Sequence, residues 1–129
     1  TYAAVRGKQK NGENLPLIPA DKLKFDLRCE FGALRKLQLD DIYISFNSQF
    51  AFKQDKSATE EVPTDAYTLF DIATGAKINF NKQPLIISLS INNLFDIKYI
   101  DHLSTLKESG FYNPGRNIAL TLRIPFIIK

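Results

Sequence analysis

Residues 23–31 read LKFDLRCEF, an unbroken alternation of apolar and polar side chains. Consecutive residues of an extended chain point to opposite faces, so a period of two predicts a β-strand with two different faces. A slip of one residue in pairing would exchange those faces, so the pattern also specifies the register. The expected apolar face consists of Leu23, Phe25, Leu27, Cys29 and Phe31.

The same period of two recurs along most of the chain. It spans residues 42–52, 68–80, 85–92 and 118–126, and a sixth, shorter strand is expected around Tyr2–Arg6. Turn-forming glycine, proline, asparagine and aspartate residues fall between these segments, and no segment has the apolar spacing of a helix. The sequence therefore predicts an all-β, antiparallel, up-and-down fold.

Composition excludes several functional classes. The chain has 129 residues, is 44% hydrophobic and carries a net charge of +3, with its 17 Lys and Arg residues spread along it, which does not favour nucleic-acid binding. One cysteine and one histidine leave little for a metal site or a catalytic triad. We expect no enzymatic activity, no cofactor and no bound metal.

Two all-β architectures fit the alternation. A soluble β-sandwich buries one face of each strand against a second sheet, whereas a membrane barrel turns that face to lipid. The expected strands are about nine to thirteen residues long, near the 9–11 or so that a tilted membrane strand needs. Long polar joins near 8–21, 54–66 and 100–117 alternate with shorter ones near 32–41 and 81–84, as external loops alternate with periplasmic turns.

These features favour a transmembrane β-barrel segment. With the long joins outside, the last strand runs inward and the C-terminus lies in the periplasm. Six strands are fewer than the roughly eight of the smallest such barrels, so we expect residues 1–129 to be one part of a larger barrel in a longer protein. Lys53, Lys56, Glu60 and Glu61, in a long join, are interpreted as a solvated face.

The segment 89–99 adds a specific resemblance. Its LSINNLFD, followed by Lys98 and Tyr99, resembles the NLFD-x-x-Y segment near the end of TonB-dependent outer-membrane receptors, and residues 113–117 (NPGRN) resemble the return of that family's last external loop. Residues 15–19 (LPLIP) and 67–71 (YTLFD) are similar to two of its earlier landmarks. The family-motif residues are Asn93, Leu94, Phe95, Asp96, Asn113, Pro114, Gly115, Arg116 and Asn117.

The resemblance implies a function and a setting. Receptors of this family are plugged barrels of about 22 strands, which take up an iron chelate, haem, cobalamin, metal ion or oligosaccharide. The implied partners are outer-membrane lipid, the remaining strands and N-terminal plug of the same protein, the periplasmic protein TonB, and the small transported ligand. The plug and the TonB box are not in this chain. The alternatives are a structural or adhesive outer-membrane barrel and a soluble β-sandwich binding module.

The final long join is the expected ligand-binding region, because long loops more often carry function than plain connection. It combines charges with aromatic surfaces, and Arg116 suits a carboxylate or phosphate. Asn92, Asn93 and Asp96 are interpreted mainly as residues that mark the external end of a strand and cap its turn. The candidate ligand-binding residues are Asp101, His102, Lys107, Glu108, Phe111, Tyr112 and Arg116.

Overall fold

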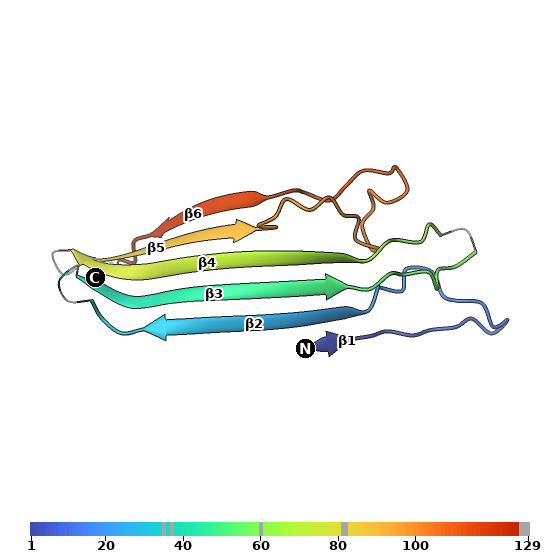
Figure 1. The fold of residues 1–129 in the computed structure, drawn as a ribbon, viewed down its shortest axis with the longest axis horizontal. Helices are drawn as coiled ribbons and strands as arrows, with labels where there is room; N and C mark the ends of the chain where they lie inside the picture. The colour runs from blue at the N-terminus through green and yellow to red at the C-terminus, as the bar shows by residue number, and fades with distance from the viewer. Residues whose placement is uncertain (35, 37, 60, 81–82, 127–129) are drawn as a thin grey trace.

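Six antiparallel strands form one open sheet, in which each strand pairs with its neighbours in the sequence (Figure 1). The computed structural model describes residues 1–34, 36, 38–59, 61–80 and 83–126. The predicted all-β antiparallel fold is confirmed. Within the described residues, no helix is long and apolar enough to cross a membrane. The strands are β1 (Tyr2–Ala3), β2 (Lys22–Phe31), β3 (Leu39–Ala51), β4 (Tyr67–Phe80), β5 (Gln83–Asn92) and β6 (Asn117–Arg123).

The register brings the apolar side chains of the strands onto one side of the sheet, here called the apolar face. One row of directly paired residues crosses five strands and is apolar throughout: Leu27, Phe46, Ile72, Ile91 and Ile118. Because side chains alternate, the neighbouring row points to the opposite, polar face. That row contains Arg28, Ser45, Ala73, Ser90 and Ala119.

The apolar face is largely exposed in this chain. Leu27 is 50% exposed and Ile118 is 65% exposed. Among the described residues, the buried hydrophobic side chains are instead Ala20, Ala51 and Tyr67, all where strands meet the long connections. An uncovered apolar surface of this extent is a surface for lipid or for another protein element.

A β-bulge distorts the start of β3. The register shifts between Asp40 and Tyr43, and Asp41 has a φ of 49°. Beyond the bulge, Tyr43 pairs with Gly75 of β4, and a Cβ on that glycine would lie 2.6 Å from Tyr43 Cε1. The ring therefore occupies the space that a side chain at position 75 would need. On its other side, the guanidinium of Arg28 lies 3.8 Å from the Tyr43 ring centre.

The strand ends differ from the sequence-based prediction at both edges of the sheet. The alternation predicts a first strand over Tyr2–Arg6, but β1 ends at Ala3, after which the chain leaves β2. It also predicts a last strand that reaches Phe126, but β6 ends at Arg123. Pro125 has no N–H to donate to a ladder, and its carbonyl accepts a bond from Gln83 Nε2 instead. Residues 81 and 82 of the expected short join lie outside the described residues.

Candidate functional site

The three long connections, residues 4–21, 52–66 and 93–116, all lie at one end of the sheet, here called the loop end (Figure 1). The last residues of β2 and β4 and the first residues of β3 and β5 lie at the opposite end. At the loop end, Lys22 and Tyr67 lie on the polar face of the sheet, whereas Tyr2 and Phe52 lie on the apolar face. Because three connections share this end, a ligand bound there could contact several loops at once.

The NLFD segment forms the turn that leaves β5. Asn93 is 4% exposed and has a φ of 52°, and its side-chain amide bonds both the N–H and the carbonyl of Ile97, at 2.8 and 2.9 Å. The backbone N–H of Asn93 donates to Asp71 Oδ1 at 2.8 Å. Phe95 stays exposed and meets Phe70 edge-on. Asn93 is thus a buried turn residue, in agreement with the sequence-based interpretation.

The same turn holds the NPGRN segment. Asp96 Oδ1 accepts the Arg116 backbone N–H at 2.8 Å, and a Cβ on Gly115 would lie 2.6 Å from that oxygen. Asn113 Oδ1 accepts the Asp101 N–H at 2.9 Å. Residues that resemble family motifs therefore contact one another and close the base of the 93–116 connection.

Asp101 fastens this connection to the sheet. Its Oδ2 accepts bonds from Lys22 Nζ at 2.5 Å and from Tyr67 Oη at 2.6 Å, at the loop ends of β2 and β4. Burial favours the neutral acid, but the bonds from Lys22 and Tyr67 outweigh it and hold the pKa of Asp101 below its ordinary value. Asp101 is therefore an ionised anchor over the polar face.

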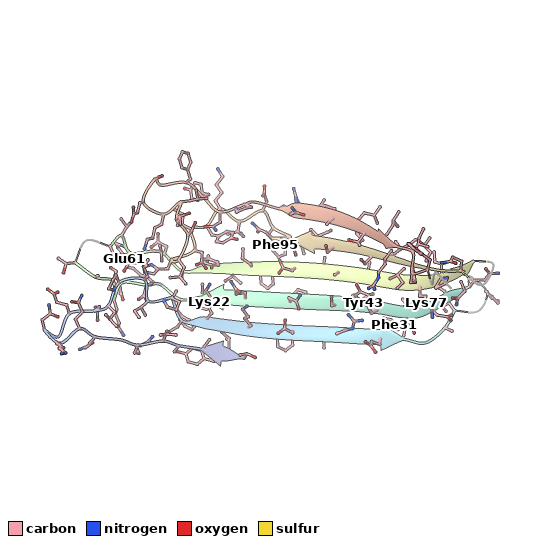
Figure 2. The ribbon with its side chains drawn as sticks, turned by 180° about the vertical axis from the view of Figure 1, so that it is seen from behind. Lys22, Phe31, Tyr43, Glu61, Lys77 and Phe95 are labelled. Carbon is pink, nitrogen blue, oxygen red and sulfur yellow. The ribbon has the colours of Figure 1, made fainter. Side chains whose placement is uncertain are left out.

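A set of polar side chains, here called the loop cluster, joins the three long connections. Its members are Glu61, Thr64, His102 and Lys107. Glu61 Oε1 accepts a bond from Lys107 Nζ at 2.8 Å, and His102 Nε2 lies 3.0 Å from the same oxygen without hydrogen-bond geometry. His102 Nδ1 pairs with Thr64 Oγ1 at 3.1 Å. The Leu17 N–H adds two longer contacts to Glu61, at 3.3 Å each. All three connections therefore meet at Glu61, which Figure 2 shows at the loop end. The sequence-based interpretation of Glu61 as part of a solvated face is wrong, because its side chain is 9% exposed and its partners lie in other connections. Glu60 of that expected face lies outside the described residues.

Burial sets the charge state of the loop cluster. His102 is 2% exposed, and its burial, reinforced by the Lys107 charge, lowers its pKa against the opposing effects of Glu61 and Asp101. Burial acts to raise the pKa of Glu61, but bonds from Lys107 and from the Ala58 N–H outweigh it and lower that pKa. The stable arrangement is an ionised Glu61 beside a neutral imidazole.

The predicted ligand-binding residues therefore divide into two groups. Asp101, His102 and Lys107 are engaged in contacts that hold the connections together. Glu108, Phe111, Tyr112 and Arg116 are exposed. Tyr112 lines a cavity of about 240 Å³ with Tyr67 and Tyr99, and Glu108 lines a wider one of about 670 Å³ beside residues 9–17. Only the exposed group is free to contact a ligand without disrupting the loops.

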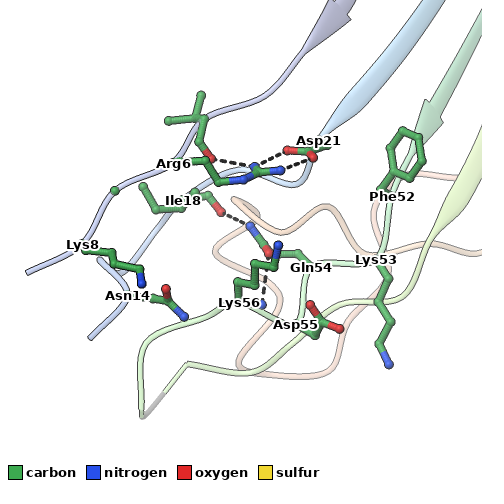
Figure 3. A pocket seen from close by; sticks show the side chains of 12 residues that line it. Arg6, Lys8, Asn14, Ile18, Asp21, Phe52, Lys53, Gln54, Asp55 and Lys56 are labelled. Carbon is green, nitrogen blue, oxygen red and sulfur yellow. Dashed lines mark hydrogen bonds and ion pairs between the residues drawn. The ribbon is translucent and has the colours of Figure 1, made fainter. Parts of the chain in front are cut away.

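A cavity of about 470 Å³ lies between the first two connections, at a place that the sequence-based interpretation missed (Figure 3). Its charged lining, Arg6, Lys8, Lys53 and Lys56 with Asp21 and Asp55, is predominantly basic, so we call it the basic cavity. Sequence alone indicates a solvated face for Lys53 and Lys56. The other basic residues of the cavity, Arg6 and Lys8, lie in the first connection rather than in the second. The one signal in the sequence is therefore the presence of two basic residues in each of two neighbouring loops.

No family model matches this chain, and no curated protein matches it. Within the described part of the chain, no three His, Cys, Asp or Glu side chains gather in a way that could hold a metal ion.

The chemistry of the loop end follows from these groups. The cavities offer tyrosine rings, lysine ammonium groups and carboxylates, which suit binding by stacking and charge. His102 is the residue type most used for proton transfer near neutral pH, but it is buried against Thr64 and Glu61. At 2% exposed, His102 is therefore shielded from a ligand in these cavities.

Proposed function

We propose that this chain is the C-terminal part of the barrel of a TonB-dependent outer-membrane receptor, which takes up a scarce ligand. The observation that carries the proposal is the two-faced sheet. Its apolar row from Leu27 to Ile118 crosses five strands, and the adjacent row from Arg28 to Ala119 is polar or small. A barrel wall between lipid and an aqueous interior needs this division.

Physical chemistry favours lipid as the environment of the apolar face. Hydrocarbon cannot hydrogen-bond a peptide group, so a sheet in a membrane must close on itself. This sheet leaves β1 and β6 as edges, and we infer that further strands of the same protein pair with them. Turning the polar face outward instead would place Lys24 and Arg28 in lipid, at about 2–4 kcal/mol for a basic group near the midplane.

The arrangement of connections supports an outward loop end. All three long connections share one end of the sheet, and barrels of outer membranes have longer external loops and shorter periplasmic turns. The NLFD and NPGRN segments, which resemble family landmarks, hold the last of these loops at its base. On this proposal, the loop end is extracellular and the C-terminus of the chain is periplasmic.

The transported ligand belongs to the set that such receptors carry: an iron chelate, haem, cobalamin, a metal ion or an oligosaccharide. We assign its first contacts to the exposed residues Glu108, Phe111, Tyr112 and Arg116. Phe111 and Tyr112 are 65% and 57% exposed, so both rings are available for stacking.

The experiment is a deletion of the gene that encodes this chain, followed by measurement of uptake of each ligand class. Uptake of one class is expected to fall and to return with the wild-type gene, but not when the proton-motive force is collapsed. A second complementing gene carries Phe111→Ala and Tyr112→Ala, and we expect it to assemble normally and transport weakly. Leu103→Ala, also exposed on this connection, is the matched control.

Other outcomes identify the alternative functions. A protein that fractionates with the outer membrane, while uptake of every class is unchanged, is a structural or adhesive barrel. A protein that stays in the aqueous fraction without detergent is a soluble β-sandwich module. Either result would overturn the transport proposal.

A further inference from the structure

We propose that the basic cavity binds the phosphate group of an anionic lipid in the outer leaflet, and so fixes the barrel's depth in the membrane. The inference rests on the proposed function, because it needs the apolar face to lie in lipid. It concerns the outer side of the loop end, away from the 93–116 connection. The first observation in favour of a lipid is that the cavity lies beside the apolar face.

The pairing of β2 with β3 shows that the basic cavity lies beside the apolar face. The Asp21 carbonyl accepts the Phe52 N–H at 2.9 Å, which extends the β2–β3 pairing by one step beyond Lys22 and Ala51. Alternation therefore puts the side chains of Asp21 and Phe52 on the side of Leu23 and Phe50, the apolar face. Both Asp21 and Phe52 line the cavity. It thus opens where the apolar face ends.

Aromatic rings lie beside the basic cavity, at the same end of the apolar face. The Phe52 ring lies 4.7 Å from that of Phe50 and 6.4 Å from that of Tyr2, each edge-on. The Tyr2 hydroxyl donates to Asp21 Oδ2 at 3.0 Å. Rings that combine an apolar body with a polar tip collect at the boundary between hydrocarbon and headgroups. The cavity therefore sits at headgroup depth.

The charges determine which headgroup fits. Arg6 pairs with Asp21 through its two terminal guanidinium nitrogens, Nη1 and Nη2, so this pair is internally neutral. Lys8, Lys53 and Lys56 form no ion pair with any carboxylate in the described ranges, and Asp55 is the remaining acid in the lining. The surplus is positive, and clusters of lysine or arginine at a membrane surface attract anionic headgroups.

Apolar lining favours a lipid over a free anion. Val5, Ile18 and Phe52 contribute to the same wall as the lysines, and Phe52 continues directly into the apolar face. A phosphate that carries acyl chains places its charge among the lysines and its chains along Phe50 and Leu23. A soluble phosphate gains only the charge contacts.

The test is lipid binding by the complete protein in neutral detergent, measured by native mass spectrometry. The variant is Lys53→Gln with Lys56→Gln, which spares the Arg6–Asp21 pair. The control is Lys24→Gln with Lys77→Gln, which removes the same charge from the polar face. Affinity for phosphatidylglycerol is expected to fall by at least about tenfold in the variant, since each surface lysine contributes about 1 kcal/mol. Affinity should be unchanged in the control.

Two companion ligands complete the experiment. Phosphatidylcholine should bind the wild type and both variants alike, and glycerol phosphate should bind all of them weakly. Equal loss in variant and control would overturn the proposal, and so would glycerol phosphate binding as tightly as the lipid, which would identify a soluble-anion site. A protein that is membrane-embedded and transports, but shows no loss in the variant, would refute this inference alone. A protein that lies outside the membrane would refute the proposed function as well.

Discussion

The sheet and the loop end of this chain are held together by different interactions. In the sheet, backbone ladders and a repeated alternation place apolar rows on one face, and no side chain of the row from Leu27 to Ile118 is buried. At the loop end, polar and charged side chains join the connections: Glu61 meets Lys107 and the neutral His102 at buried positions, and the half-buried Asp101 meets Lys22. We therefore expect the sheet to tolerate exchanges that preserve its alternation, whereas the loop end should be sensitive to changes at a few individual residues.

The largest expected effect comes from placing a charge on the apolar face. Phe46→Lys puts an ammonium between Leu27 and Ile72, near the middle of β3, and we expect a cost of about 2–4 kcal/mol in lipid. Its neighbour Asn47→Lys is the control, since that side chain faces Asp26 and Asp71. The amount of assembled protein in the outer membrane should fall sharply only for Phe46→Lys. Equal effects would contradict the assignment of the faces.

The next effect is expected at the loop cluster. Glu61→Gln removes the negative charge that pairs with the buried Lys107, and its amide nitrogen cannot accept from the backbone N–H groups that contact Glu61 Oε2. Leaving such polar groups unsatisfied costs about 1–3 kcal/mol. Because Glu61 also contacts the first connection through Leu17, we expect faster hydrogen exchange in all three connections while the strands stay protected. The control variant Glu108→Gln, at an exposed position, should leave hydrogen exchange unchanged in the connections and in the strands. Loosening confined to residues 52–66 would show that Glu61 does not join the loops.

A smaller and more local effect is expected within the sheet. Gly75→Ala introduces a Cβ 2.6 Å from Tyr43 Cε1 and 2.9 Å from the Ile87 carbonyl, and such overpacking typically costs about 1–3 kcal/mol. Gly32→Ala, where nothing lies within 4 Å of the new Cβ, should be neutral. Adding Tyr43→Ser should recover part of the loss in unfolding experiments. An unchanged Gly75→Ala protein would show that the Tyr43 ring does not need the space at this glycine.

The smallest effect is a pH dependence of the loops. The pKa of His102 is lowered in the folded protein, so the unfolded chain binds more protons as pH falls through the ordinary value of 6.5. Loop stability should therefore decrease below about pH 6.5, and decrease further when Glu61 and Asp101, whose pKa values are also lowered, become protonated. Hydrogen exchange of residues 93–116 measures this. His102→Gln should remove the first step, and persistence of that step in the variant would show that a group other than His102 causes it.

Sequence patterning predicted the sheet because each strand carries its own signal. Leu23–Phe31 alternates without a lapse, and even Ser48 and Thr74, which interrupt the apolar sequence, keep their places on the apolar face. The exceptions have local causes: Pro125 lacks a donor, and the bulge after Asp40 shifts a register. Strand boundaries elsewhere agree to within a few residues.

The loop end was less predictable because its contacts join residues far apart in the chain. Glu61 and Lys107 are separated by 46 positions, and no spacing rule connects them. His102 was a candidate for ligand contact because it lies in the last long join, yet it is buried in the loop cluster. Conversely, Lys53 and Lys56 were interpreted as solvated and line the basic cavity. Charge composition identified the residue types, and only the folded loops determine which of them stay free.

The native Cys29 allows the most direct test of the central claim, that the apolar face lies in lipid. Cys29 is exposed on this face, and a nitroxide attached to it reports collisions with oxygen, which concentrates in lipid, and with a water-soluble nickel complex. In the membrane-embedded protein we predict frequent collisions with oxygen and few with nickel. The same label at Asn47→Cys, in a Cys29→Ser background, should show the reverse. Nickel access at Cys29, or shielding from both reagents as in the core of a sandwich, would contradict the account.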